Sequence, residues 1–397
     1  MTSSEYVYLD ISIGGTQIGR VVIQLFTELS PKAAKNMLVL SQEKAFVNVI
    51  FHRVIKNFMI QTGDTTSGVL SNLKSESDYP PANLGKGGKS IYADSTNPTG
   101  TFADENLNYP IDRAFLVCMA NSSEPDTNTS QFFISTFASP HLTGHHSVFG
   151  SVIYGKSVVR QIERVRILSN QSGPGSTRSW VPVYEEIVSI TDCGQWFEGS
   201  EVPIFNACYD RIGGDIYEEY PDDNEIEGFD MENGDSTYAA TNLIKDSGSL
   251  LFKKKRLNDA LLKYKKALRY CNELIPDVDT DKKNYNKFLE LKKKIFLNLS
   301  LVSLQLSKYQ DVIDYCGFFL EMGKEVKPTN MESSKTLFRL GKAYVGLKKY
   351  SEGLEFLRSA SILNPEDAAI QKEVLAIEKI VAEANKTQQA KYAKFFS

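Results

Sequence analysis

One short stretch in the first half of the chain gathers side chains that could bind an apolar compound carrying a carbonyl. The run FHRVIKNFMIQTGD, residues 51–64, holds a cation, an aromatic ring, a thioether and an amide, at Arg53, Phe58, Met59 and Gln61. Its alternating apolar residues predict two short strands joined at residues 56–57, and residues two apart on a strand share a face. No Ser, Cys or Asp nucleophile stands beside a base here, which argues against covalent catalysis. The stretch therefore predicts an apolar hollow with a guanidinium and an amide at its edge.

A second block of sequence completes a family pattern. It comprises FLVCMAN at residues 115–121, NTSQFFI at 128–134 and HLTGHHSVFG at 141–150. The first stretch resembles the FHRVIxxFMxQxGD signature of cyclophilins, the peptidyl-prolyl cis/trans isomerases, and the second block follows in the family's order. The resemblance implies an isomerase that needs no cofactor.

The elements around these blocks fit the same fold. Residues 6–13 and 18–26 alternate around Gly14-Gly15, which predicts a hairpin. Ser30 and Pro31 are an N-cap and first-turn pair that opens a helix to about Gln42, and a second helix is expected over 156–165. Many short strands with few helices indicate a closed antiparallel β-barrel. This agrees with the cyclophilin fold, an eight-stranded barrel with helices at its ends.

The resemblance also assigns the site. Rotation about a prolyl bond faces a barrier of about 18–20 kcal/mol, and a catalyst has only to bind the twisted amide better than the planar forms. Arg53 is expected to donate to the proline nitrogen, which accepts a hydrogen bond only in the twisted state. The expected catalytic set is Arg53, Phe58, Met59, Gln61, Asn121 (through its backbone), Phe133, Leu142 and His146. The expected groove residues are Ala120, Gln131, His141, Gly85 and Gly87.

The same residues also allow other interpretations. The aromatics could be barrel core and Arg53 a surface ion-pair partner, but the two blocks together favour the site. GKGGKS at 85–90 lacks the first glycine of a phosphate-binding loop and precedes a strand-like pair, so it is expected to form a turn at the groove rim. The histidines near residue 145 have no partner ligands at zinc spacing, so no metal site is predicted.

The chain departs from the family in several places. His141 stands where most cyclophilins have Trp, so cyclosporin is an expected but weakened ligand. Thr62 and Thr65 replace the usual Gly and Phe, and Glu124 lengthens the turn between the two parts of the second block by one residue. A Ser-rich insert follows at 66–82. These changes predict weaker catalysis than in single-domain relatives.

Length and composition limit the class of protein. A chain of 397 residues is too long for one core, and its 42% hydrophobic and 24% charged content is typical of globular proteins. The five scattered cysteines favour reduced thiols. No signal peptide or apolar run of membrane length is evident. We expect a cytoplasmic protein without nucleic-acid or membrane partners.

The second half of the chain has a different character. Residues 212–244 contain ten acidic residues and no Lys or Arg, which predicts an extended, self-repelling linker. Beyond it, small and aromatic residues recur at helical spacing and resemble tetratricopeptide (TPR) repeats, with a weaker middle copy. The expected domains are a cyclophilin-type domain over 1–200, the acidic linker over 201–236, three repeats in an all-α solenoid over 237–368 and a capping C-terminal helix over 369–397.

This order of domains resembles that of the forty-kilodalton cyclophilins, which are co-chaperones of heat-shock protein 90. The resemblance implies that a carboxylate clamp binds that chaperone's C-terminal EEVD peptide, with heat-shock protein 70 as a further candidate partner and proline-containing client polypeptides as substrates. The clamp would comprise Lys245, Ser249, Asn298, Lys335 and Arg339.

Three questions remain open at this stage. The clamp cations could instead belong to a solvated lysine-rich face. The ending YAKFF at 392–396 resembles the family's C-terminus but could be the tail of a capping helix. The cyclophilin-type domain could also serve mainly as a non-catalytic adaptor that holds clients.

Overall fold

The computed structural model describes residues 4–73, 75–168 and 180–395. The chain divides into two compact units, Met1–Asn206 and Ala207–Ser397. Each unit has its own hydrophobic core, and each is described here by itself. Phe396, the last residue of the ending singled out in the sequence, lies outside the described residues.

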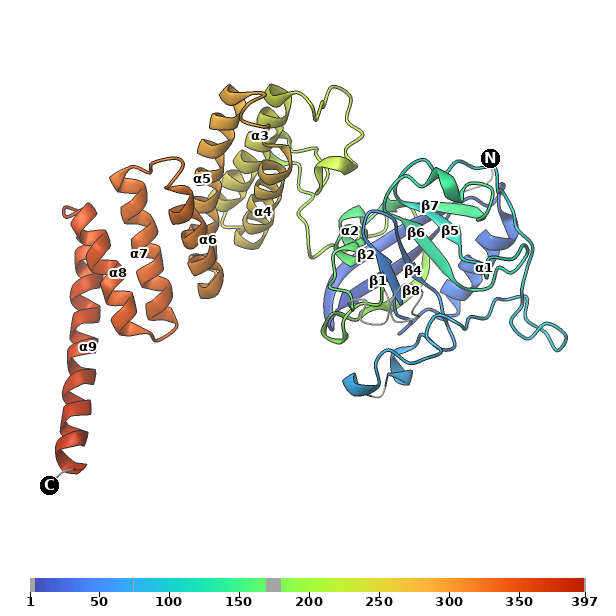
Figure 1. The fold of residues 1–397 in the computed structure, drawn as a ribbon, viewed down its shortest axis with the longest axis horizontal. Helices are drawn as coiled ribbons and strands as arrows, with labels where there is room; N and C mark the ends of the chain where they lie inside the picture. The colour runs from blue at the N-terminus through green and yellow to red at the C-terminus, as the bar shows by residue number, and fades with distance from the viewer. Residues whose placement is uncertain (1–3, 74, 169–179, 396–397) are drawn as a thin grey trace. The chain divides into compact units, whose positions relative to one another are not determined.

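The first unit is an antiparallel sheet that curls into a barrel (Figure 1). Its strands, within the described residues, follow the order β3-β4-β6-β5-β7-β2-β1-β8. They are β1 (Glu5–Ile13), β2 (Thr16–Leu25), β3 (Arg53–Ile55), β4 (Met59–Thr62), β5 (Leu116–Met119), β6 (Phe132–Ser135), β7 (Val148–Tyr154) and β8 (Val188–Trp196). The segment before β3 pairs with β8 through the bridge between Ile50 and Ser189, which brings the two ends of the sheet together. The predicted antiparallel barrel is confirmed.

The predicted first hairpin and first helix are present. Gly14 and Gly15 have φ of +54° and +77°, the left-handed values that a tight turn between β1 and β2 requires. Helix α1 (Pro31–Gln42) begins as expected, but the Ser30 hydroxyl does not cap it and donates instead to Val148 O at 2.7 Å. The Glu105 carboxylate accepts from the Lys32 and Ala33 N–H groups and so satisfies the helix start from another segment.

The core of the barrel follows the alternation along its strands. Val54, Ile60, Phe132 and Ile134 point into the main core, together with residues of β1, β2, α1 and α2 (Lys156–Glu163). The side chains between them on β4 and β6 point to the other face, where Met59 and Phe133 join a smaller apolar cluster. This second face carries the candidate site. Thr62 lies on the core side, fully buried, with its hydroxyl on Ile50 O at 2.9 Å.

The 66–82 insert is tied to the barrel by one buried carboxylate. Asp64 Oδ1 accepts from the Ser67 N–H at 2.8 Å, and Asp64 Oδ2 accepts from the Gly85 and Gly87 N–H groups at 2.8 and 3.3 Å. Both ends of the insert are therefore held at the same residue, beside the glycine turn that the sequence placed at the groove rim.

The second unit is a stack of helices (Figure 1). The helices are α3 (Gly234–Lys253), α4 (Leu257–Leu274), α5 (Lys282–Gln305), α6 (Tyr309–Met322), α7 (Asn330–Gly346), α8 (Tyr350–Leu363) and α9 (Ala368–Phe395). They pack as consecutive pairs, and small residues allow the close approach. A Cβ on Gly248 would lie 2.8 Å from the Tyr264 ring, and one on Gly341 would lie 2.6 Å from Leu357 Cγ. The predicted all-α region with a C-terminal helix is confirmed.

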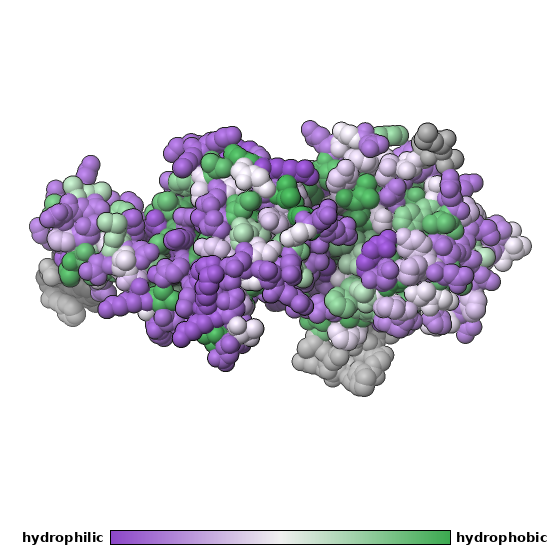
Figure 2. All heavy atoms as spheres, turned by 90° about the horizontal axis from the view of Figure 1, so that it is seen from above, coloured by the Kyte–Doolittle hydropathy of each residue, from purple (hydrophilic) through white to green (hydrophobic). Residues whose placement is uncertain are grey.

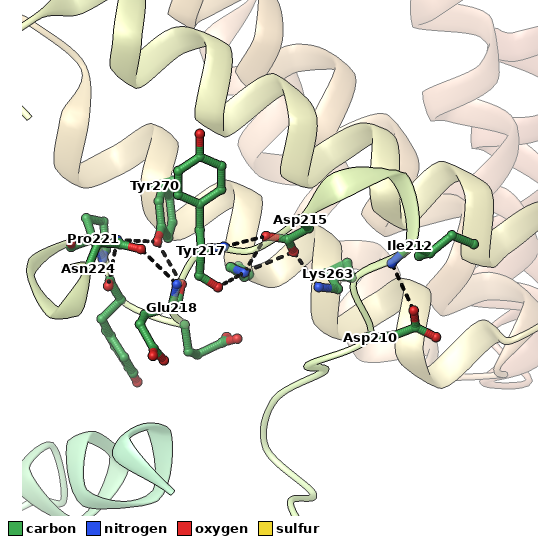
Figure 3. A network of polar contacts seen from close by, with 12 residues as sticks. Asp210, Ile212, Asp215, Tyr217, Glu218, Pro221, Asn224, Lys263 and Tyr270 are labelled. Atoms are coloured by element: carbon green, nitrogen blue, oxygen red, sulfur yellow. Dashed lines mark hydrogen bonds and ion pairs between the residues drawn. The ribbon is translucent and has the colours of Figure 1, made fainter. Parts of the chain in front are cut away.

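The prediction of an extended acidic linker is wrong. Asp215 is 2% exposed and forms ion pairs with Lys263 and Lys266 of α4, and Figure 3 shows Asp215 beside Lys263. Glu219 pairs with Arg269 at 2.7 Å. The segment therefore packs on the helical unit, whose boundary falls at residue 207. Repulsion among the carboxylates would extend the segment, but the cations that α4 supplies offset this repulsion.

Hydrogen bonds to backbone carbonyls and to a side-chain amide complete this network. The Tyr270 hydroxyl donates to Glu218 O at 2.7 Å and accepts from Asn224 Nδ2 at 2.8 Å (Figure 3). The Lys266 ammonium also donates to Tyr217 O at 2.6 Å. Because backbone carbonyls of the segment are bonded as well as its carboxylates, the segment is fixed along its length and not only at its charges.

The surface is mixed in character. Figure 2 shows hydrophilic residues over much of the visible face, with smaller apolar areas between them. Among the described residues, no helix combines the length and apolar character that a membrane crossing requires.

Candidate functional site

Strand register places three predicted site residues in one row. Arg53 on β3 pairs with Gln61 on β4, and Gln61 pairs with Phe133 on β6. Residues paired across strands point to the same face of a sheet. The fold therefore puts the cation, the amide and the aromatic ring side by side, although Phe133 is 80 positions away from Arg53 in the chain.

These residues border a groove of about 520 Å³. All eight residues of the predicted catalytic set line it, together with Ala120 of the predicted groove set. Met59 and Phe133 are each 4% exposed and form its apolar floor, with Phe58 and Leu142 packed beside them. The fold thus provides an apolar hollow with polar groups at its edge, as the sequence predicted.

Arg53 is the cation of this groove without a countercharge. Its side chain lies exposed at the rim, and within the part of the chain that the structure describes it makes neither an ion pair nor a hydrogen bond. Partial burial against the groove lowers the pKa of its guanidinium, which nevertheless remains charged at neutral pH. The donors of Arg53 are therefore available to a ligand.

Two amides link this groove to a neighbouring hollow. Gln61 Nε2 donates to Gln131 Oε1 at 2.9 Å, and Gln131 Nε2 donates to Gly85 O and Gly87 O at 3.0 and 2.6 Å. A second hollow of about 470 Å³ is lined by these residues and by Ala120. The chain of bonds fixes the Gln61 side chain and leaves its carbonyl oxygen without a partner among the described residues.

The groove lining at Asn121 and His146 is also fixed by hydrogen bonds. The Asn121 side chain donates to His145 O at 2.8 Å and accepts from the Ser123 N–H at 3.2 Å, so its backbone is the part left for a ligand. His146 Nδ1 lies 3.0 Å from Met119 O, which requires the proton on Nδ1. Its ring stands edge-on to Phe133 at 5.1 Å, and burial lowers the pKa of His146, so the imidazole is neutral at pH 7.

His141 lies beside the groove and not in its lining. Its ring stacks on Phe58 with centroids 5.6 Å apart and an angle of 21° between the planes. His141 itself is exposed at the end of a short 3₁₀ turn, Pro140–Leu142. His141 therefore contacts the groove through Phe58, which lines it.

Sequence reasoning did not assign a role to several residues that line the two hollows. Asp104, Leu107, Ser123, Pro125 and Gly144 line the first hollow, and Lys86, Thr99, Thr101, Thr127 and Thr129 line the second. Asp104 was detectable in principle, because its carboxylate accepts from Asn128 Nδ2 at 2.7 Å and Asn128 belongs to the second signature block. The remaining residues are ordinary loop residues whose place is set by the tertiary fold.

The five residues of the predicted clamp lie on α3, α5 and α7. Lys335 is exposed, whereas Lys245 has a 14% exposed side chain and pairs with Asp246 at 2.6 Å. The Ser249 hydroxyl donates to Lys245 O and accepts from the Tyr264 hydroxyl, each at 3.2 Å. Asn298 is half-buried.

Arg339 differs from the other clamp residues in being held by its own unit. It donates to Leu297 O at 2.6 Å and to Ser300 Oγ at 3.0 Å, and burial lowers its pKa. Part of its hydrogen-bonding capacity therefore joins α7 to α5, and only the remaining donors are open to a ligand.

Comparison with known proteins agrees with the site. Residues 8–194 match the family of cyclophilin-type peptidyl-prolyl cis-trans isomerases. The chain is also 41% identical to the peptidyl-prolyl cis-trans isomerase CYP7 of Saccharomyces cerevisiae, over an alignment of 416 positions that covers all of both chains. The chain belongs to the cyclophilin-type peptidyl-prolyl cis-trans isomerases. The groove just described is the hollow of this cyclophilin unit that gathers the family's signature residues.

The one thiol close to the groove lining among the described residues, Cys118, is not suited to covalent catalysis. Cys118 lies beneath the groove, fully buried, and burial raises the pKa of its thiol, so it is not an activated nucleophile. Among the described residues, no group of His, Cys, Asp and Glu is arranged to hold a metal ion. Isomerisation about a prolyl bond breaks no covalent bond.

Proposed function

We propose that the groove isomerises X-Pro bonds with Arg53 as the group that favours the twisted amide. The observation that carries the proposal is the row formed by Arg53, Gln61 and Phe133, in which an unpaired guanidinium stands at the edge of an apolar floor. The proline ring would lie on Met59 and Phe133, with Phe58 and Leu142 at its sides.

The physical basis of this mechanism is the change in the proline nitrogen as the bond rotates. In a planar amide the nitrogen lone pair is delocalised and accepts no hydrogen bond, whereas in the twisted amide it becomes an acceptor. A donor aimed at that nitrogen binds the transition state better than either ground state. Gln61 and the backbone of Asn121 would hold the neighbouring peptide groups so that rotation is confined to one side of the bond.

Isomerisation of a proline peptide, followed by a chymotrypsin-coupled assay, tests this assignment. Arg53→Ala should lower kcat/KM by about 10²–10³-fold, because one preorganised donor is lost. Arg53→Lys keeps the charge without the fork of donors and should retain part of the activity. Arg211→Ala, at an exposed arginine of the other unit, serves as the control. An unchanged rate in Arg53→Ala would refute the assignment.

We further propose that the helical unit binds the acidic C-terminal EEVD peptide of heat-shock protein 90, with heat-shock protein 70 as a second partner. Support comes from the places of Lys245, Asn298, Lys335 and Arg339 on the first helices of successive pairs. A terminal Asp presents two carboxylates close together, and charge-assisted hydrogen bonds contribute about 1.5–3 kcal/mol each. This activity would make the protein a cytoplasmic co-chaperone that acts on proline-containing clients.

Calorimetry with a peptide ending Met-Glu-Glu-Val-Asp tests the clamp. Lys335→Ala should weaken binding about tenfold to a hundredfold, and amidation of the peptide should have a comparable effect. Added salt should also weaken binding, since Lys335 is exposed. If neither the substitution nor amidation matters, the clamp does not exist.

A second candidate for the cyclophilin unit is a non-catalytic adaptor that holds clients. The motivating observations are the insert at the groove rim and the lengthened turn at Glu124. Refolding of an aggregation-prone client distinguishes the two functions. An adaptor retains its protective effect in Arg53→Ala, whereas an isomerase whose catalysis limits refolding loses it.

A further inference from the structure

The turn that follows Asn121 lines the same groove as Arg53, and hydrogen bonds hold it in place. Asp104 and Asp126 exchange hydrogen bonds, with the Asp126 N–H on Asp104 Oδ2 at 2.9 Å and the Asp104 N–H on Asp126 Oδ1 at 2.8 Å. Thr127 Oγ1 donates to Glu124 O at 2.7 Å and accepts from the Ser122 N–H at 3.0 Å. The backbone of the turn is therefore fixed beside the groove.

Two carboxylates of this region line the groove, and only one of them has its hydrogen bonds satisfied. Asp104 accepts from Asn128 Nδ2 as well as from the Asp126 N–H, so it serves the turn. The Glu124 side chain is exposed, lines the same groove as Arg53, and has no ion pair or hydrogen bond within the described residues. The groove lining thus contains an unpaired cation, Arg53, and an unpaired anion, Glu124, within the described residues.

We infer that Glu124 determines substrate specificity and that the groove prefers X-Pro segments carrying a lysine or arginine within two residues of the proline. This inference rests on the proposed function, because it assumes that the groove is where the proline bond is isomerised. A substrate cation would meet the Glu124 carboxylate without competition from a protein cation, whereas a substrate anion would be repelled there. Because Glu124 is exposed, water screens the attraction and the preference should be two- to fivefold.

The test compares three peptides that differ at one position next to the proline, occupied by lysine, by norleucine or by glutamate. Isomerisation is followed by proton NMR exchange in the full-length protein, so that no coupling protease adds its own preference. We expect kcat/KM for the lysyl peptide to exceed that for the norleucyl peptide two- to fivefold, with the glutamyl peptide slowest. The advantage should fall as the salt concentration rises.

Two variants make the test specific. Glu124→Gln should bring the lysyl-to-norleucyl ratio to about one, while Glu43→Gln, at the exposed glutamate that directly follows α1 and lies outside the groove lining, should keep the wild-type ratio. A wild-type ratio of one, or a ratio that survives Glu124→Gln, overturns the inference. If the norleucyl peptide is not isomerised at all, the proposed function itself fails, which is a different result.

Discussion

Arg53 in the substrate groove and the lysines of α4 are cations in partly apolar surroundings, but the chain treats them differently. Lys263 and Lys266 are 1% and 2% exposed, and the carboxylate of Asp215 lies between them. Arg53 lies beside an apolar floor with no carboxylate supplied to it among the described residues. The lysines that pair with Asp215 stabilise the fold. Arg53 has no such partner among the described residues, so its guanidinium is available to a ligand.

The sequence alone does not distinguish Arg53 from the lysines of α4. Both segments contain cations near aromatic and apolar residues, and only the tertiary contacts show which of these cations pair with a carboxylate. Arg339 illustrates the intermediate case, because it was predicted as a ligand-binding cation and in fact donates to Leu297 O and Ser300 Oγ. Substitutions at these residues can therefore show whether a cation stabilises the fold or binds a ligand.

The largest effect on stability is expected at Asp215, the carboxylate that pairs with the buried lysines of α4. Asp215→Asn removes the carboxylate shared by two buried lysines and should lower the free energy of unfolding of the helical unit by about 3–5 kcal/mol. Burial already lowers the pKa of Lys266, so the loss should be partly relieved at high pH as the lysine gives up its proton.

Urea unfolding can report on the two units separately. Both tryptophans, Trp180 and Trp196, belong to the first unit, so their fluorescence follows the barrel while circular dichroism follows mainly the helices. Asp215→Asn should shift the dichroism transition alone, and Asp222→Asn, at an exposed aspartate, should shift neither. A loss below about 1 kcal/mol in Asp215→Asn would show that the network is not a stabilising element.

The next effect concerns a buried group beside Arg53. Burial lowers the pKa of His52 to about 4 although Asp64 opposes the shift, so the folded protein holds His52 neutral. The unfolded chain binds a proton near pH 6.5, so below that value protons favour the unfolded state. The contribution of His52 to stability is thus complete above about pH 6.5 and is lost as the pH falls toward 4. The loss should amount to roughly 2–3 kcal/mol.

Tryptophan fluorescence across a urea series at pH 4 to 7 measures this dependence in the barrel. His52→Gln carries no titrating ring and should show a flatter decline of stability between pH 6.5 and 4 than the wild type. Equal slopes in the two proteins would mean that other groups account for the acid sensitivity.

Much of the fold and of the groove could be predicted from the sequence. The alternation around Arg53 and Gln61 gave the two strands, and the paired signature blocks gave all eight residues of the first set that line the groove. These predictions succeeded because strand period and local turns are encoded by neighbouring residues. The resemblance gave the barrel, whereas the long-range pairing of β4 with β6 is seen only in the structure, because no local pattern determines it.

The failures have a common physical cause. The acidic segment was taken as extended because its charges repel one another, yet Asp215 and Glu219 are neutralised by cations from α4, some 50 positions later in the chain. The Ser30 hydroxyl was expected to cap α1, yet it donates to Val148 O on a distant strand. Both errors concern contacts between distant segments, which spacing along one segment cannot reveal.

Two residues of the predicted clamp, Arg339 and Lys335, should differ in how much they contribute to stability. Arg339→Ala removes hydrogen bonds to α5 and should lower the stability of the helical unit by about 1–3 kcal/mol, in addition to any loss of peptide affinity. Lys335→Ala removes an exposed side chain and should leave stability within about 0.5 kcal/mol of the wild type. Circular dichroism in urea measures both. Equal stability of the two variants would show that the bonds of Arg339 to α5 carry no net stabilisation.

The smallest effect is expected at His141, whose ring stacks on Phe58 of the groove. Replacing it by Trp adds aromatic area against Phe58 and an indole N–H at an exposed position, and an aromatic pair contributes about 0.5–1.5 kcal/mol beyond area burial. His141→Trp should therefore tighten cyclosporin binding about threefold to tenfold, as measured by quenching of tryptophan fluorescence. His141→Phe supplies ring area without a donor, so the difference between the two variants gives the share of the N–H. If neither variant binds more tightly than the wild type, access to the hollow is limited elsewhere. The insert at 66–82, which Asp64 holds beside the glycine turn of the second hollow, is then the segment to shorten.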